Sequence, residues 1–239
     1  PADDRIAHAP THVGLDERRK MKWSYSSMKL FEQCPRKYFH LRVLKDIVEP
    51  ESEAMLYGTR FHEAAELYIR DGTPIPEYFK FAKGALDSLR NIEGEKLCEY
   101  EMGITADLEP CGFKDERVWY RGIADLLIIN REKGEARVID YKTGKSAKYA
   151  DPDQLELMSL CVFKHFPEVK KVKAGLLFVI ANAFPKAQFD LTDEVRWDKW
   201  KYKHQRLQAA YDNDTWNPKP SGLCKAWCPV LSCSHNGRA

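Results

Sequence analysis

The sequence predicts an α/β domain in which helices cover a mixed β-sheet, and two patterns indicate this. Residues 24–90 contain helical segments with their own start and stop signals, whereas from residue 97 onward the apolar residues alternate or form short runs that are typical of strands. A helix over residues 151–166 then separates a meander of three strands from a further apolar strand. This order of helices and strands is typical of a single mixed sheet with helices on its faces.

Capping residues define the helices of the first half. A short helix begins at Ser24, where hydroxyl side chains can cap it, and Pro35 stops or kinks it. Residues 52–71 form a longer helix that ends at Gly72, a residue able to adopt the left-handed conformation that often closes helices. Residues 76–90 form another helix, which we interpret as a helical insertion.

The second half is predicted to form the sheet. The expected strands are residues 97–104, 118–130, 137–142, 174–180 and 188–191. A hairpin turn over residues 130–135 joins the second strand to the third. The following helix has Asp151 as its N-cap and Pro152 at its first position, and its apolar residues lie almost all round it, so we expect it to be buried against the sheet. A long final helix is expected over residues 192–211.

Length and composition suit a single folded domain. The chain has 239 residues, of which 44% are hydrophobic and 12% aromatic, and this excludes fibrous and wholly disordered classes. We expect residues 1–20 to be a flexible lead, and residues 21–239 to be one domain with a helical part (52–96), a sheet core (97–191), and a last helix with a cysteine cluster (192–239).

Charge and hydropathy limit the partners. The net charge of +2 excludes a surface that is positive all over but leaves room for local basic patches. No apolar run is long enough to span a membrane, and the first ten residues lack the apolar region of a signal peptide. We therefore expect an intracellular, cytoplasmic protein with no membrane partner.

The segment Val138–Gly144 (VIDYKTG) is the main candidate for chemistry. Alternation along a strand places Asp140 and Lys142 on one face and Tyr141 on the other. A carboxylate beside an ammonium group suits a metal site that handles phosphate, although a simple charge pair is the alternative.

Asp125 strengthens the case for a metal site. It lies within an otherwise apolar strand, where an ionised carboxylate is costly unless it is paired or binds a cation. The hairpin allows Asp125 and Asp140 to lie side by side, as the carboxylates of a divalent-cation site do. The alternative is a buried aspartate that is satisfied by a nearby Arg or Lys. Gly122, near the start of the same strand, indicates close approach of backbone or ligand.

Four short motifs occur in a fixed order: GTRFH (58–62), GIAD (122–125), IDYKTG (139–144) and QLELM (154–158). In this order they resemble the RecB-like branch of the PD-(D/E)XK nucleases, which includes nuclease domains of bacterial recombination complexes, CRISPR-adaptation nucleases and phage exonucleases. The resemblance extends from residue 24 to residue 233. It implies a restriction-endonuclease-like fold and hydrolysis of DNA.

The resemblance also implies roles for individual residues. The metal ligands for Mg²⁺ or Mn²⁺ would be the side chains of His62, Asp125 and Asp140 together with the carbonyl group of Tyr141. Lys142 would be the catalytic lysine, acting with Asp125 and Asp140. Gln154 would support the site from the start of the next helix. One departure is Met158, because the family commonly has Tyr four residues after this glutamine.

Each of these residues also has a plainer interpretation. His62 has Glu66 four residues later, so the two could form an exposed pair, or Glu66 could orient His62 as a ligand. Gln154 is the third residue of a helix capped by Asp151, which a capping box would explain. Glu101 is interpreted as the partner of a strand arginine rather than as part of the site.

Three of the seven cysteines are closely spaced. Cys224, Cys228 and Cys233 form a C-x3-C-x4-C cluster of soft ligands, which argues for a metal centre with either Cys34 or His235 as its fourth ligand. In members of this nuclease family that carry a [4Fe–4S] cluster, one cysteine precedes the nuclease core and three follow it. Cys34 and the three later cysteines resemble this layout. The spacing is looser than the family's common C-x2-C-x5-C. A structural Zn²⁺ and bare thiols are the alternatives.

Basic residues recur in two places. Lys142, Lys145 and Lys148 follow one another along the strand and loop of the candidate site. On the last helix Arg196, Lys199, Lys203 and Arg206 share one face, next to a face that carries Trp197, Trp200, His204, Leu207 and Tyr211. This stripe is typical either of a single-strand binding groove or, more often, of a solvated face beside an aromatic core.

Together these observations predict a divalent-metal-dependent DNA nuclease, in the form of an exonuclease that acts on single strands or ends in recombination, repair or phage DNA processing. The alternatives are a non-catalytic DNA-binding or assembly subunit with the same fold, and a zinc-ribbon interaction protein. The sequence has no P-loop motif, so unwinding would have to come from a partner such as a helicase or recombination protein.

Overall fold

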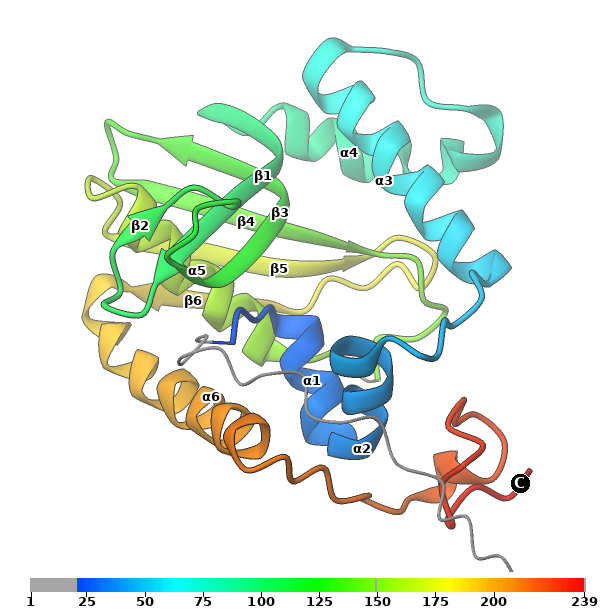
Figure 1. Ribbon diagram of the computed structural model, residues 1–239. Coiled ribbons are helices and arrows are strands. Elements are labelled where there is room, and N and C mark those ends of the chain that lie inside the picture. Colours follow the sequence, from blue (N-terminus) through cyan, green and yellow to red (C-terminus); the bar gives the residue numbers. More distant parts are fainter. Residues whose placement is uncertain (1–20, 149, 239) are drawn as a thin grey trace, which may run out of the picture.

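A six-stranded mixed sheet forms the centre of the molecule, as the sequence predicts. The computed structural model describes residues 21–148 and 150–238, and it arranges the strands in the order β2-β1-β3-β4-β5-β6 (Figure 1). The strands are β1 (Glu95–Thr105), β2 (Pro110–Cys111), β3 (Val118–Asn130), β4 (Glu135–Lys142), β5 (Lys171–Phe178) and β6 (Lys186–Asp190). The two-residue β2, which pairs with the end of β1, was not expected.

The pairing of the strands makes the sheet mixed. β1, β3 and β4 form an antiparallel meander, and the β3–β4 hairpin turns at Gly134, whose φ of +60° suits a residue without a side chain. β4 then pairs with β5 in parallel, in a register that places Asp140 beside Leu176, while β5 and β6 are antiparallel. The parallel pair requires a crossover, and the helix between β4 and β5 supplies it.

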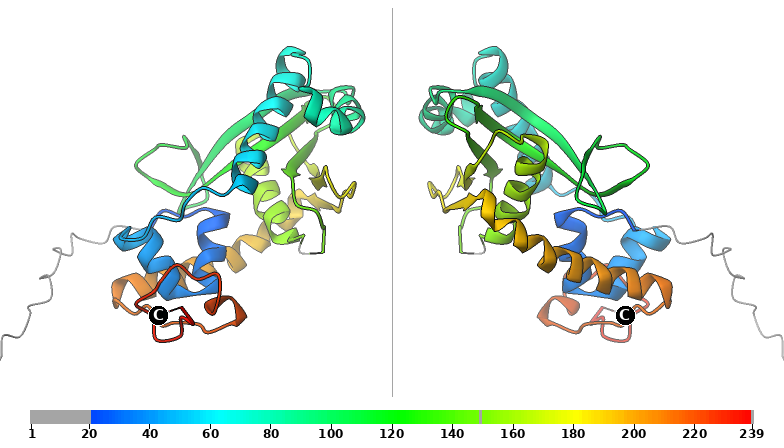
Figure 2. Two further views of the ribbon diagram at one scale, coloured as in Figure 1. Left: turned by 90° about the vertical axis from the view of Figure 1, so that its right-hand side faces the viewer. Right: turned by 90° about the vertical axis from the view of Figure 1, so that its left-hand side faces the viewer.

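Helices cover both faces of the sheet. One apolar cluster joins α3 (Glu53–Asp71), the 3₁₀ turn Glu77–Ala82 and α4 (Lys83–Arg90) to one face. A second cluster joins α1 (Tyr25–Gln33), α5 (Pro152–His165) and α6 (Trp197–Asp212) to the other. Figure 2 shows α3 and α4 at one end of the molecule and α1, α6 and the C-terminal segment at the opposite end.

The capping signals correctly locate most helix ends. Ser52 caps α3 by accepting a hydrogen bond from the Met55 amide, and Gly72 ends this helix with a φ of +74°. Pro35 does not end the helical path but divides it, because α1 is followed by the short α2 (Pro35–Tyr38) and a π-helical turn, Phe39–Leu44. The final helix is shorter than expected: residues Leu191–Arg196 form a 3₁₀ turn, and α6 begins at Trp197.

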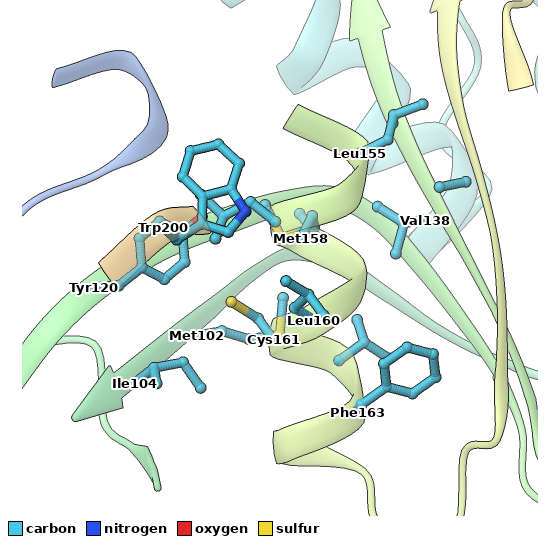
Figure 3. Close-up of a cluster of buried hydrophobic side chains, with 14 of the residues drawn as sticks. Met102, Ile104, Tyr120, Val138, Leu155, Met158, Leu160, Cys161, Phe163 and Trp200 are labelled. Carbon is cyan, nitrogen blue, oxygen red and sulfur yellow. The ribbon is translucent and has the colours of Figure 1, made fainter. Parts of the chain in front are cut away.

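α5 is the central helix of the core. Asp151 caps it and Pro152 begins it, as expected, and nine consecutive residues from Leu155 to Phe163 are buried. Figure 3 shows side chains of this helix packed against side chains of β1, β3 and β4 and against Trp200 of α6. The buried carboxylate of Glu156 accepts a hydrogen bond from Trp200 Nε1 at 3.1 Å, which ties α6 to α5.

The C-terminal segment packs back onto the first helices. The Trp216 ring stacks on Phe39, with ring centroids 5.1 Å apart, and Lys219 Nζ donates a hydrogen bond to the Glu32 carbonyl at 2.8 Å. These contacts bring residues that are far apart in sequence to the same end of the fold. Within the described ranges, no helix combines the length and apolar character needed to cross a membrane.

Candidate functional site

The site begins where β3 and β4 separate. The last paired residues toward the open end of the hairpin are Leu126 and Ile139, so Asp125 lies one step beyond the paired region. Its Oδ2 accepts a hydrogen bond from the Tyr141 amide at 2.6 Å, which replaces a ladder hydrogen bond with a side-chain one. The residue is only 9% exposed. The fold therefore buries a carboxylate beside the strand that carries Asp140.

His62 reaches this carboxylate from α3. Its Nε2 lies 3.2 Å from the Tyr141 carbonyl oxygen, and its Nδ1 lies 3.5 Å from Asp125 Oδ1. The expected partner Glu66 does not contact it, because Glu66 pairs with Arg70 on the exposed side of α3. The imidazole thus points into the sheet, and both the pairing with Glu66 and the orienting role of Glu66 are wrong.

Glu99 is the site residue that the sequence analysis missed. The β1–β3 register pairs Cys98 with Leu126 and Tyr100 with Ala124, so Glu99 lies opposite Asp125. Its backbone has a φ of +47°, which is uncommon for a residue with a side chain. Its Oε1 lies 3.8 Å from His62 Nδ1.

The neighbouring acidic residue considered from the sequence, Glu101, is instead exposed. Knowledge of the β1–β3 register would have identified Glu99, because Glu99 is the acidic residue of β1 that faces Asp125. A strict alternation starting at Glu101 would also have placed Glu99 on the same face. The irregular backbone at Glu99 breaks that alternation, and the sequence does not reveal it.

Asp140, Lys142 and Gln154 form a second connected group. Lys142 Nζ lies 2.6 Å from Asp140 Oδ2 and donates a hydrogen bond to Gln154 Oε1 at 3.1 Å. The Gln154 amide group donates a hydrogen bond to Asp140 Oδ1. The capping box is not formed, because Asp151 accepts from the Asp153 amide while the Gln154 side chain turns toward β4. Gln154 therefore joins the start of α5 to both charged residues of the VIDYKTG segment.

Two other positions of the motifs have structural explanations. A Cβ atom on Gly122 would lie 2.5 Å from the Tyr120 hydroxyl and 3.2 Å from Met158 Cε, so the glycine permits close packing of side chains. Met158, which stands where the resembling family commonly has Tyr, is buried in this contact. No ligand is needed to explain Gly122.

The electrostatics of the site are dominated by its carboxylates. Burial, and next the nearby charge of Asp140, raise the pKa of Asp125 to about 7, although His62 and the Tyr141 amide act in the opposite direction. Burial disfavours the charged form of His62, but the carboxylates of Glu99 and Asp125 outweigh it and raise the pKa of the imidazole. Burial is the larger cause of the Asp125 shift and neighbouring carboxylates add to it, so a cation beside them would favour the charged form of Asp125.

The donor atoms fit a hard divalent cation. Ligand atoms of His62, Glu99 and Asp125 all lie within 4.8 Å of one another, and the described residues contain one such group. Glu99 Oε1 is buried and has no hydrogen-bond partner among the described residues, which is costly for a carboxylate unless something else satisfies it. Carboxylate and carbonyl oxygens with one imidazole are ligands that Mg²⁺ and Mn²⁺ accept. The residues present therefore fit the expected metal.

The four cysteines named from the sequence come together. One hollow at the C-terminal end of the molecule is lined by Cys34, Cys224, Cys228, Cys233 and His235. Backbone amides of Lys219 and Ser221 lie 3.4 Å from the sulfurs of Cys34 and Cys224 respectively.

The spacing and surroundings of these sulfurs bear on the kind of metal centre that they suit. No three of them lie within 4.8 Å of one another in the described part of the chain, whereas tetrahedral zinc with Zn–S bonds of about 2.3 Å holds sulfurs about 3.8 Å apart. A four-iron cluster separates its ligand sulfurs further, since each binds a different iron. Arg36, Lys37 and Lys219 line the same hollow, and their positive charges suit a negatively charged thiolate centre.

The basic stripe of α6 is largely neutralised by neighbouring helices. Lys199 Nζ lies 2.8 Å from Asp153 and 2.6 Å from Glu156, and Lys203 Nζ lies 2.9 Å from Glu32. The adjacent face carries the buried residues Trp197, Trp200, His204 and Leu207. This stripe is therefore mainly a core-packing face with an ion-paired edge. The loop lysines Lys145 and Lys148 are exposed near the candidate site.

Several known proteins are similar to this chain in sequence or in structure. One curated relative, the Gene 69 protein of Mycobacterium phage L5, is 24% identical over 285 residues that cover 87% of this chain and 96% of the relative. Two solved structures are also similar. SSO0001 has a TM-score of 0.41 at 14% identity and covers 94% of this chain and 90% of its own. A candidate exonuclease from Eubacterium rectale has a TM-score of 0.49 at 13% identity, with coverage of 92% and 91%.

A sequence profile of the PD-(D/E)XK nuclease superfamily matches residues 22–233, which span the sheet, both groups of candidate site residues and the cysteines. The mixed sheet with helices on both faces agrees with the restriction-endonuclease-like fold of these enzymes. The chain therefore belongs to the PD-(D/E)XK nuclease superfamily.

Proposed function

We propose that this protein is a divalent-metal-dependent DNA nuclease, and more specifically an exonuclease that acts on single strands or DNA ends in recombination, repair or phage DNA processing. The observation that carries the proposal is the convergence of the donor atoms of His62, Glu99 and Asp125 beside the Asp140–Lys142 pair. The choice of DNA and of exonucleolytic cleavage rests on the resemblance of the four sequence motifs to RecB-like nucleases.

His62, Glu99, Asp125 and Asp140 would hold the cation, with the Tyr141 carbonyl as a further oxygen ligand. A divalent ion bound there would polarise the scissile phosphate and lower the pKa of an attacking water. The chain contributes the burial that excludes competing water, since Asp125 is 9% exposed. It also holds the ligands on three strands and a helix, and such support keeps their geometry defined before substrate binds.

Lys142 is the group we assign to the reacting phosphate. Its ammonium is held between Asp140 and Gln154 at 2.6 and 3.1 Å, so its position is defined by two acceptors rather than by solvent. A cation fixed in this way stabilises the negative charge that develops when water attacks a phosphodiester. Gln154 acts as a positioning residue, because its amide contacts Asp140 and Lys142 together.

The cysteines form a separate proposal. We assign Cys34, Cys224, Cys228 and Cys233 to one structural thiolate metal centre, with a [4Fe–4S] cluster preferred over zinc. The preference over zinc is supported by the finding that no three of these sulfurs lie within 4.8 Å of one another among the described residues. Thiolates are soft ligands that compete poorly for Mg²⁺, so the two centres would take different metals. A metal here would fasten the C-terminal segment to α1 and stabilise the fold.

The first prediction concerns the lysine. Lys142→Ala should lower the rate of metal-dependent DNA cleavage by about 10²–10³-fold, because a charge aimed at the reacting phosphate is lost. The matched control is Lys145→Ala, since Lys145 is an exposed loop residue three positions further on. Cleavage of end-labelled and circular DNA is followed with Mg²⁺, with Mn²⁺ and with EDTA. Equal rates for Lys142→Ala and the parent, or full cleavage in EDTA, would contradict the proposal.

The second prediction concerns Glu99. Glu99→Gln should weaken Mn²⁺ binding by at least about tenfold, because it removes one negative ligand of nearly unchanged shape. Titration calorimetry with the metal alone measures this directly. Glu101→Gln, on the same strand but exposed, should bind Mn²⁺ like the parent. If both variants lost affinity equally, the effect would be one of overall charge, and Glu99 would not be a ligand.

The third prediction concerns Asp125 in metal-free protein. Its pKa is raised from 3.8 to about 7, so ionising Asp125 is harder in the folded state than in the unfolded state. The free energy of unfolding therefore falls as pH rises above about 4, and the loss is complete above about 7. Asp125→Asn keeps an acceptor for the Tyr141 amide and removes the charge. In EDTA it should therefore increase the free energy of unfolding at pH 8 by about 4 kcal/mol, and by less at pH 5.

Urea unfolding at the two pH values provides the measurement for Asp125→Asn. Saturating Mn²⁺ should narrow or reverse the difference at pH 8, because the parent binds the metal more tightly and gains more stability from it. A variant that is less stable than metal-free parent at pH 8 would show that the buried charge is already compensated by the protein.

The fourth prediction concerns the cysteines. Cys34→Ser should lower both the metal content and the melting temperature about as much as Cys228→Ser, because both supply ligands to one centre. Cys111→Ser, at an isolated cysteine of β2, should change neither. Iron, zinc and acid-labile sulfide are measured on anaerobically purified protein. Zinc without sulfide would favour the zinc alternative, and an unaffected Cys34→Ser variant would favour His235 as fourth ligand.

A further inference from the structure

A basic groove lies at the opposite end of the molecule from α3 and α4. It consists of two adjoining hollows that share Gln33 and Lys219, one of about 420 Å³ beside α1 and α6 and the other beside the cysteines. We call it the α1 groove, and define it by the lining residues Lys29, Gln33, Lys37, Arg206, Lys219 and Trp227. The cysteine centre accounts for part of the groove, because Cys34, Cys224 and Cys228 line the second hollow, whereas Lys29 and Arg206 line only the first.

The groove is positively charged. Four of its defining residues are basic, whereas Glu32 is the one acidic residue among the described residues that line the two hollows. Glu32 is already bound by Lys203, and the ammonium of Lys219 contacts a backbone carbonyl rather than a carboxylate. Lys29 and Lys37 have carboxylate partners outside the groove, at Asp151 and Glu49. Arg206 and Lys219 are therefore the two basic residues of the groove without a carboxylate partner among the described residues, and theirs are the charges that it offers to an anionic ligand.

An exposed aromatic residue stands at the far end of the groove. The Trp227 side chain is 75% exposed, unlike the other described tryptophans, which are all buried. Neighbouring Leu223 is 47% exposed and lines the same hollow. A tryptophan face open to solvent beside basic side chains can stack on a nucleic-acid base while the cations contact phosphates.

The near end of the groove lies close to the candidate catalytic residues. Lys29 Nζ is 2.8 Å from a carboxylate oxygen of Asp151, the residue that caps α5. Gln154 follows three residues later, about 4.5 Å along the helix axis, and contacts both Asp140 and Lys142. A chain of phosphates that leaves the catalytic residues along the start of α5 therefore meets Lys29 first and Trp227 last.

We infer that the α1 groove binds the single-stranded DNA that flanks the scissile phosphate, with phosphates at Lys29, Arg206 and Lys219 and a base stacked on Trp227. The inference rests on the proposed nuclease function. The hollow beside α1 and α6 has a volume of about 420 Å³, the size of a small-molecule site, which can take part of one strand but not a duplex. An acidic peptide would use the positive charge but not the exposed indole face.

The test measures binding of a fluorescent 20-nucleotide oligo(dT) to the full-length protein by anisotropy in EDTA, where no cleavage occurs. Trp227→Ala should weaken binding by about tenfold, and Trp227→Phe should largely restore it, because stacking needs an aromatic face. Arg206→Ala should weaken binding and reduce the salt dependence by about one phosphate contact. Tyr202→Ala, an exposed aromatic residue of α6 that does not line the groove, should bind as the parent does.

Arg206→Ala keeps the inference testable if the Trp227 variants fold poorly, because Arg206 is exposed on α6 and does not line the cysteine hollow. Unchanged affinity in both Trp227→Ala and Arg206→Ala would overturn the inference. The inference would also be overturned if polyglutamate displaced the fluorescent oligo(dT) more effectively than unlabelled oligo(dT) does, since this would assign the groove to an acidic protein. Binding in EDTA is independent of cleavage, so a protein that binds through the groove but never cleaves would refute only the proposed function.

Discussion

The burial of the Asp125 carboxylate is the constraint on which the rest of the site depends. A charge in an apolar strand must be satisfied, and the structure does so by several local departures from regular geometry. The Tyr141 amide donates to Asp125 instead of to a neighbouring strand, so β3 and β4 open at this point. α3 directs His62 into the opening, and the backbone at Glu99 takes a φ of +47° that accompanies a carboxylate aimed at the same place. Burial and the charge of Asp140 raise the pKa of Asp125, while His62 and the Tyr141 amide offset part of the shift, and a cation bound beside these carboxylates would offset more of it.

α5 connects the site to the buried core of the fold. Its middle is buried all round, which secures the helix, and only its first turn reaches the site. Gln154 can therefore hold Asp140 and Lys142 without contributing to the core, and Asp151 links the same turn to Lys29 of α1. The core residues Leu155–Phe163 offset the cost of the polar groups that the site buries, as is common where function requires locally unfavourable groups.

The sequence predicts the features that depend on local patterns. Proline and capping residues locate the start of α5, and alternation places Asp140 and Lys142 together, so this half of the site follows from the chain itself. What the sequence does not reveal depends on register and long-range packing. Glu99 faces Asp125 only because of the β1–β3 pairing and an irregular backbone, and Glu66 turns to Arg70 because of how α3 meets the sheet. The meeting of Cys34 with three cysteines some 190 residues later follows from family resemblance alone.

The two candidate centres differ in the kind of constraint they place on the chain. Oxygen ligands of the carboxylate site come from strands that the core already positions, so this site exists before a metal binds. The cysteine sulfurs come from Cys34, at the junction of α1 and α2, and from a segment anchored by Trp216 and Lys219. A metal there would contribute to folding rather than to chemistry, because it closes a loop of nearly the whole domain.

The α1 groove runs between the two centres, along the surface that this closure creates, and Trp227 lies between Cys224 and Cys228 in the sequence. Holding the C-terminal segment in place would then also hold Trp227 in line with Lys29, so a centre that takes no part in hydrolysis would still define the path by which a strand reaches the carboxylates.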